Sequence, residues 1–396
     1  MLVFYATTHD FHLKNLVQTT ADVDPPKDNE IYERLLQGKG RGFALYVPEP
    51  NMHLPHAYQK IGINIGDVGF ITPDGAFSFL FNICVPRDDP INPRILPEDF
   101  SLLQPMLTDF DVAKFPRFKS GSYLASASIE KKESESNTRC VTPSLESSIP
   151  KLLFNTRELR GLHFETSASE GAVLTMPEGA ISLDLENDLA FSNYLEANVQ
   201  KWYEFVYRVR GKSIRNGELR LVIGCDKTTA WGIATVSGMS QHSTNKLKFK
   251  ASDAAGSPTS TYTWECSGMV EVRVGPDKHD IEALRSDDTL NTTLRNQCLF
   301  VRTMTATLSN DEWAKLMRNL GKTAVKDPKT FSVTTLGPSL GRRPSGSNTE
   351  SSGQSGFHQG MSGTQHSAIG KESGITISTT PNLPVSIPSL YAMQYW

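Results

Sequence analysis

The chain has little cysteine and no long apolar run, and each absence excludes a class of protein. Its 396 residues include five cysteines and no CxxC pair. Secreted folds stabilised by disulfides usually carry a denser, even set, so we expect reduced thiols and a cytoplasmic location. No stretch reaches the roughly 18 apolar residues that a transmembrane helix needs. The first residues, MLVFYATTHD, lack the basic and then apolar segments of a signal peptide, and we expect none.

The chain also lacks an excess of positive charge. Its 40 Lys and Arg residues are outnumbered by 43 Asp and Glu residues, which gives a formal net charge of −3. Nonspecific nucleic-acid binding depends on Lys and Arg that displace counterions from phosphates. We therefore expect no nucleic-acid partner.

Several catalytic and metal-binding motifs are missing as well. No HExxH zinc motif, no G-x-S-x-G nucleophile elbow and no GxGxxG dinucleotide loop occurs. The pairs His9/His12 and His53/His56 have neither helical spacing nor a nearby third ligand, so we interpret them as surface histidines. We predict no catalytic residue, no cofactor and no metal site.

The residues that are present favour an α+β, mainly β fold. Gly and Pro are frequent, at 29 and 23 residues, and many short segments alternate apolar and polar residues as half-buried strands do. Two β-rich blocks, expected to form sandwich-like sheets, cover residues 1–123 and 160–322. A polar, Ser- and Glu-rich segment over 124–159 is predicted to be a flexible excursion between them.

One amphipathic helix stands out within the second block, over residues 188–206. Four apolar residues repeat there at spacings of four and three, which places them on one helical face, and Asp188 is a suitable N-cap. The four residues are Leu195, Val199, Trp202 and Val206. The helix is expected to pack this face on a sheet.

The stretch LRLVIGCDKTTAWGIATV, residues 219–236, raises the question of a phosphate-binding loop. Such a loop needs G-x-x-x-x-G-K-[ST] between a strand and a helix, whereas here the glycine before the lysine is missing and a strand-like run follows. The pattern therefore predicts a β-hairpin. Its exposed polar tip would present Asp226, Lys227, Thr228 and Trp231 to a ligand or protein partner.

The last part of the chain changes in composition. Residues 323–396 are rich in Ser, Gly and Thr with few large apolar residues, and we predict a disordered tail, most clearly over 326–385. Within it, GRRPSGS places two arginines shortly before Ser345, a pattern typical of sites for basic-directed kinases. The final residues, IPSLYAMQYW, regain aromatic content and could dock or act as a linear motif.

Three segments carry a resemblance to a known group of proteins. QKIGINIGDVGFITPDGAFSFLFNIC, GAVLTMPEGA and GELRLVIGCDKTTAWGIATV resemble a lineage-expanded family of intracellular proteins from mushroom-forming basidiomycete fungi. The resemblance covers roughly residues 35–320. It brings no catalytic residues, and it implies recognition or regulation rather than central metabolism.

Three functional hypotheses remain open on the sequence. The first is a non-enzymatic cytoplasmic interaction or regulatory protein, in which hairpin loops and the tail contact a protein partner. The second is a β-rich membrane-active or self/non-self effector, and the third is a hydrolase with an unrecognised site. Liposome leakage would distinguish the second from the first.

Overall fold

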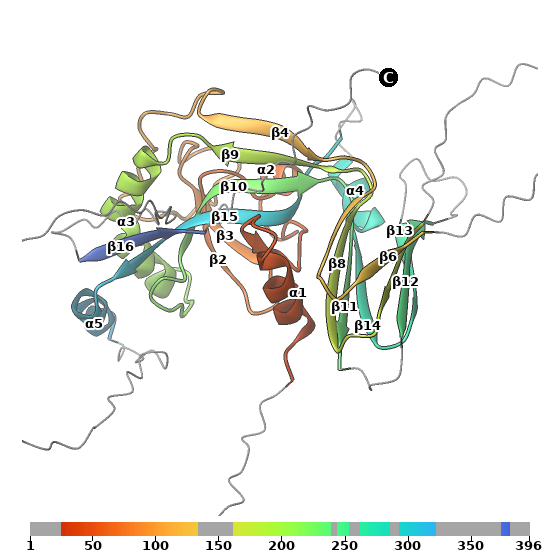
Figure 1. Cartoon of the computed structure of the whole chain (residues 1–396). Coiled ribbons are helices and arrows are strands. Elements are labelled where there is room, and N and C mark those ends of the chain that lie inside the picture. The colour runs from red at the N-terminus through yellow and green to blue at the C-terminus, as the bar shows by residue number, and fades with distance from the viewer. Residues whose placement is uncertain are drawn as a thin grey trace, which may run out of the picture.

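The computed structural model describes residues 25–133, 161–238, 244–252, 262–285, 293–321 and 374–380. More of these residues form antiparallel strands, which are arranged in three sheets, than form helices (Figure 1). The predicted α+β, mainly β class is therefore confirmed. No helix in the described ranges is long and apolar enough to cross a membrane.

The largest sheet, sheet A, has eight strands. Five of them follow the order β1-β15-β10-β2-β3, while β9 adds to β10, β4 adds to β9, and β16 adds to β15. The strands are β1 Phe43–Ala44, β2 Asp67–Ile71, β3 Phe77–Asn82, β4 Val112–Phe118, β9 Ala180–Leu185, β10 Arg220–Thr228, β15 Gln297–Leu308 and β16 Ile375–Thr379.

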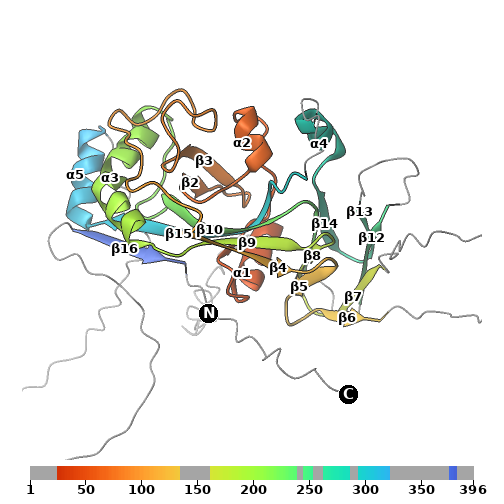
Figure 2. The ribbon, with the colours of Figure 1, turned by 90° about the horizontal axis from the view of Figure 1, so that it is seen from above.

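Two four-stranded sheets pack face to face as a sandwich and bury a shared apolar cluster that includes Phe164, Val173 and Leu247 (Figure 2). Sheet B has the order β14-β11-β8-β5, and sheet C has the order β13-β12-β7-β6. Sheet B contains β5 Ser122–Ala125, β8 Glu170–Met176, β11 Trp231–Ser237 and β14 Val270–Gly275. Sheet C contains β6 Glu130–Lys132, β7 Leu162–Thr166, β12 Asn245–Ala251 and β13 Tyr262–Ser267.

The same strand order runs through all three sheets. The order β4-β9-β10-β15 in sheet A becomes β5-β8-β11-β14 in sheet B and β6-β7-β12-β13 in sheet C. Short connections carry the chain from β4 to β5, from β8 to β9 and from β10 to β11, so neighbouring strands bend together at one corner. Sheets A and B are therefore joined by the chain itself as well as by side-chain packing.

Five helices in the described residues cover these sheets: α1 Asp28–Gln37, α2 His56–Ile61, α3 Leu189–Arg208, α4 Lys278–Arg285 and α5 Asn310–Asn319. Helix α3 confirms the predicted helix, since it begins after Asp188 and its whole predicted stripe is buried in the largest core cluster. It lies with α5 at one end of sheet A (Figure 2). Helix α1 sits at the corner, where it contacts β1, β8 and β11, and Tyr32 and Leu36 share an apolar cluster with residues of these strands and of β15.

Some predicted boundaries differ from the structure. Strands β1 and β2, from the predicted first block, pair with β15 and β10 of the second, so both blocks share sheet A. The predicted excursion contains strand β6 and the end of β5, because their residues find partners in β7 and β8. The rest of it, residues 134–160, lies outside the described residues.

The predicted disorder of the C-terminal tail is wrong over residues 375–379, which form strand β16. Its isoleucines gain apolar contacts only when β15 is beside them, and a single-sequence pattern does not contain that information. The remainder of the predicted disordered tail lies outside the described residues, as do Ser345 and the final aromatic segment.

The four described cysteines are free thiols. Cys225 and Cys298 are buried and Cys84 is half-buried, whereas Cys266 is exposed at the end of β13, although it lies on the same face as Trp264. Cys140 lies outside the described residues.

Candidate functional site at the outer edge of strand β15

The predicted hairpin tip at residues 226–231 is instead a buried corner. Strands β10 and β11 do not pair with each other, because β10 belongs to sheet A and β11 to sheet B. Asp226, Lys227, Thr228 and Trp231 are between 0% and 5% exposed. The prediction that they form an exposed contact surface is therefore wrong, since two strand patterns around a short polar link describe a bend between sheets as well as a hairpin.

Thr228 and Trp231 connect this corner to the neighbouring strands through hydrogen bonds. The Thr228 hydroxyl donates to the carbonyl of Gly179, 2.6 Å away, at the bend between β8 and β9. The Trp231 indole N–H donates to Oε1 of Gln297 on β15 at 3.0 Å. Each buried polar group thus has a partner on an adjacent strand, as a buried position requires.

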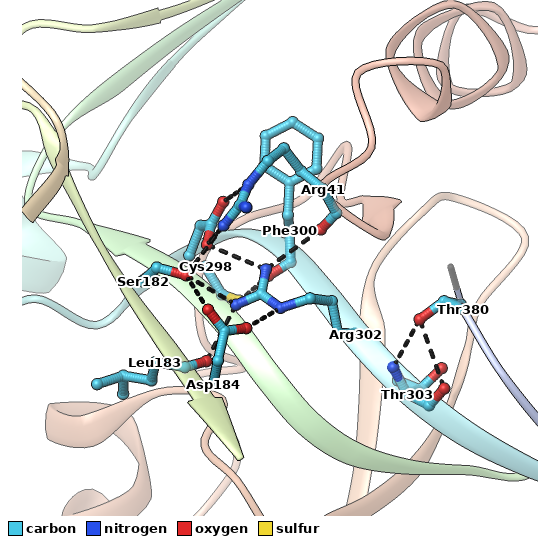
Figure 3. Close-up of polar contacts among 10 residues, drawn as sticks. Arg41, Ser182, Leu183, Asp184, Cys298, Phe300, Arg302, Thr303 and Thr380 are labelled. Atoms are coloured by element: carbon cyan, nitrogen blue, oxygen red, sulfur yellow. Dashed lines mark hydrogen bonds and ion pairs between the residues drawn. The ribbon is translucent and has the colours of Figure 1, made fainter. Parts of the chain in front are cut away.

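Asp226 forms ion pairs with two buried arginines, Arg41 and Arg302. Both arginines are labelled in Figure 3. The Asp226 carboxylate accepts two hydrogen bonds from Arg41, at 2.6 and 2.8 Å, and one from Nη1 of Arg302 at 3.0 Å. Arg302 also forms an ion pair with Asp184. The Ser182 hydroxyl accepts from both guanidinium groups, at 2.9 and 3.0 Å, and donates to Asp184.

This network has two positive and two negative side chains and links three strands with the segment that follows α1. Burial alone would lower the pKa of the Arg302 guanidinium, but the charges of Asp226 and Asp184 raise it above its ordinary value. The guanidinium therefore stays charged and bound. Its effect is to fix β15 against β9 and β10, immediately before Thr303.

The outer edge of β15, opposite β10, is shared by two short strands. Strand β1 pairs at Phe43↔Val301 and Ala44↔Phe300. Further along, β16 pairs antiparallel with β15 from Met304 to Leu308. Residues 322–373 separate β16 from α5, so this edge is completed by a segment distant in sequence.

Hydrogen bonds hold both ends of β16. The Thr303 N–H donates to the Thr380 hydroxyl at 2.9 Å, and the Thr380 N–H donates to the Thr303 carbonyl at 3.0 Å (Figure 3). At the other end, the Ser309 N–H donates to the Gly374 carbonyl at 2.7 Å. Ser309 is also the N-cap of α5, where its hydroxyl accepts from Glu312 N.

The two faces of β16 differ in chemistry. Ile375 and Ile377 are half-buried and pack on the core beneath sheet A, and Ile377 lies opposite the small Ala306. On the other face, the Ser378 and Thr305 hydroxyls hydrogen-bond at 2.8 Å. The edge therefore accepts an extended segment with aliphatic residues at alternate positions and hydroxyl residues between them.

The sequence did not identify Arg41, Ser182, Asp184 or Arg302, because they come from four separate segments. One indication of the network was present in the sequence. The apolar run QCLFVRTMTATL contains Arg302, and a charged residue inside a buried strand requires a partner. His53 and His56 are exposed, as predicted, while His9 and His12 lie outside the described residues. Among the described side chains, no group of three or more His, Cys, Asp and Glu could hold a metal ion.

Comparison with known proteins gives no family: no protein-family model matches the chain, and no curated protein is similar to it.

Proposed function

We propose that this protein is a non-enzymatic interaction protein that binds an extended segment of a partner protein along the outer edge of β15. The observation that carries the proposal is the pairing of β16 with that edge. Addition of a strand to a sheet edge is a common mode of peptide recognition, in which the backbone supplies affinity and alternate side chains supply specificity. In this proposal, β16 is the internal occupant and a partner segment replaces it.

The rigidity of β15 supports this role. Its residues before Thr303 are held by the Arg302 network, and its other edge is paired with β10 along most of its length. An edge that is already ordered does not lose further conformational freedom when a peptide binds. The expected partner segment has the pattern of β16, with two aliphatic residues two positions apart.

The family resemblance and a cytoplasmic location remain part of the proposal. They rest on the sequence motifs and on the free thiols, and both are compatible with binding to an intracellular partner.

Binding of a labelled peptide to the full chain tests the proposal. The peptide GITISTT copies residues 374–380. In an Ile375→Asp/Ile377→Asp variant, the charged side chains oppose burial and release β16, so the peptide binds saturably in fluorescence anisotropy. The wild-type chain binds it at least about 100-fold more weakly, because a tethered strand competes at an effective concentration on the order of millimolar.

A matched control places the same charges on the opposite face. Thr376→Asp/Ser378→Asp alters exposed positions of β16, so the strand stays in place and the peptide binds as weakly as to wild type. A peptide with aspartate in place of both isoleucines binds neither variant. Absence of peptide binding to the Ile375→Asp/Ile377→Asp variant would contradict the proposal.

A further inference from the structure

A second site lies where sheet A divides, on the other edge of β10. This edge pairs with β2 at Arg220 and Leu221, and with β9 from Gly224 to Lys227. Between the two pairings, β2 and β9 diverge and leave a pocket of about 480 Å³. Its walls come from α2, the loop that precedes β2, the end of β3, residues 107–114 and β9.

Asp67, the first residue of β2, is fully buried and lines this pocket. Its carboxylate accepts hydrogen bonds from the Asn64 N–H at 2.8 Å, the Asn82 amide at 2.7 Å and the Tyr58 hydroxyl at 3.2 Å. All three donors are neutral. Among the described residues, no cationic side chain comes within ion-pair distance of this carboxylate.

Asp226 shows how the same chain treats another fully buried aspartate. There, two arginines contact the carboxylate directly, and the charge is compensated. A buried carboxylate without such a partner carries a large desolvation cost. The difference between the two sites is that Asp67 lines a pocket. Because its side chain is fully covered in this structure, the cation of a ligand would reach it after a shift of the neighbouring side chains.

The charge of the Lys227 ammonium acts on Asp67, but this ammonium is bound elsewhere. It donates to the Ile61 carbonyl at 2.6 Å. Burial raises the pKa of Asp67 to about 7, and the hydrogen bonds from Asn64 and Asn82 together with the charge of Lys227 only partly oppose that shift. Above about pH 7, the Asp67 carboxylate therefore carries a negative charge opposed only by neutral hydrogen-bond donors and by the charge of Lys227.

The remaining walls indicate the size and character of the ligand. Seven of the sixteen lining residues are aliphatic, and the exposed mouth of the pocket carries one acidic residue, Asp109, and one basic residue, Lys114. The aliphatic wall residues are Ile61, Ile65, Val85, Ile91, Leu107, Val112 and Leu183. A charged group at the floor and a hydrocarbon part against these walls would fill the space.

We propose that this pocket binds a small organic cation, with an ammonium group at Asp67 and a short hydrocarbon portion against the aliphatic walls. The site is separate from the outer edge of β15, so the proposal holds whether or not a peptide binds there. An ammonium group would satisfy the remaining acceptor capacity of the carboxylate and supply the missing positive charge.

Calorimetric titration of the full chain with hexylammonium chloride and with 1-hexanol tests this proposal. The two probes share a hydrocarbon chain and differ in charge. At pH 8, hexylammonium is expected to bind one site at least ten-fold more tightly than hexanol. In the Asp67→Asn variant, the hexylammonium affinity falls at least ten-fold and the preference for the ammonium disappears.

A second variant tests the pocket independently of whether Asp67→Asn folds correctly. Leu107→Trp adds bulk to the pocket wall without touching the hydrogen bonds of Asp67, and it is expected to weaken both probes. Asp109→Asn, at the mouth, is expected to change the hexylammonium affinity less than three-fold. Equal affinities of wild type for the two probes, no binding of hexylammonium, or unchanged binding by Asp67→Asn and Leu107→Trp would each overturn the proposal.

Binding should also depend on pH. Protonation of Asp67 removes the attraction, so the hexylammonium affinity is expected to fall as pH drops from 8 to 5, while the hexanol affinity stays constant. The other titratable or charged groups that face Asp67 or the pocket are Tyr58, Cys84, Lys227, Asp109 and Lys114. Burial raises the pKa of Tyr58 and of the Cys84 thiol, the latter to about 12, so both stay neutral over this range.

Discussion

At the scale of single residues, two buried aspartates illustrate opposite solutions to the same electrostatic problem. Asp226 is surrounded by guanidinium groups and stabilises the junction of β9, β10 and β15. Asp67 is held by neutral donors beside a pocket. The first arrangement stabilises the fold, and the second leaves a negative charge that a cationic ligand can bind.

Removal of Asp226 is expected to destabilise the fold strongly. Asp226→Ala leaves Arg41 and Arg302 buried without their shared partner, and loss of one member of a buried ion pair costs about 3–5 kcal/mol. Urea unfolding followed by circular dichroism measures the loss. Arg34→Met serves as the control, because its ion pair with Glu170 is largely exposed and contributes at most about 1 kcal/mol. Equal losses in the two variants would contradict the structural role of Asp226.

The titration of Asp67 should appear in the pH dependence of stability. Its pKa in the folded chain, about 7, lies above the ordinary value of 3.8, so the folded state holds this proton more tightly than the unfolded state. The resulting stabilisation is full below about pH 4 and is lost as pH rises through 7. Wild type should therefore lose roughly a few kcal/mol relative to Asp67→Asn between pH 4 and 8. Parallel stability curves for the two proteins would exclude this shift.

At the scale of elements, the alternation of aliphatic and hydroxyl residues along β16 explains why so short a strand stays paired with β15. Five residues form few backbone hydrogen bonds, and each contributes only about 1 kcal/mol net. The two isoleucines add apolar burial against the core beneath sheet A, and Thr380 and Gly374 close the ends. The strand is therefore held by the sum of small contributions, which a competing segment could replace.

Hydrogen exchange measures directly how far β16 protects the backbone amides of β15. In Ile375→Asp/Ile377→Asp, the amides of β15 that face β16 lose their partners, so those within residues 303–309 should exchange at least about ten-fold faster than in wild type. Amides of β15 that face β10 should keep their protection. Thr376→Asp/Ser378→Asp should leave both sets unchanged. Unaltered exchange in the first variant would show that β16 does not depend on its isoleucines.

At the scale of the whole molecule, the bent strands join sheets A and B into one structure. The chain passes from one sheet to the other at β4–β5, β8–β9 and β10–β11, and Thr228 and Trp231 connect neighbouring strands at this corner. Helix α1 fills the angle and contacts strands of both sheets. Within the described residues, strands of both predicted β-rich blocks pair in sheet A.

This arrangement predicts a single cooperative unfolding transition. Trp231 lies at the corner and Trp202 in the core under α3, so two variants that each keep only one of these as the sole tryptophan, with the others changed to Phe, observe different parts of the molecule by fluorescence. For each variant, the urea midpoint from fluorescence should coincide with its midpoint from circular dichroism. Two separated midpoints in either variant would indicate independent units and contradict the shared-sheet architecture.

The sequence by itself determined the mainly β class, the position of α3 and its buried stripe, since these depend on periodicities within one segment. Only the tertiary structure decided that Asp226 to Trp231 form a buried corner, that β16 completes the edge of β15 and that Asp67 borders a pocket. Each of these depends on which distant segments meet. Strand pairing and charge pairing are long-range, and the local pattern around a residue does not reveal its partner.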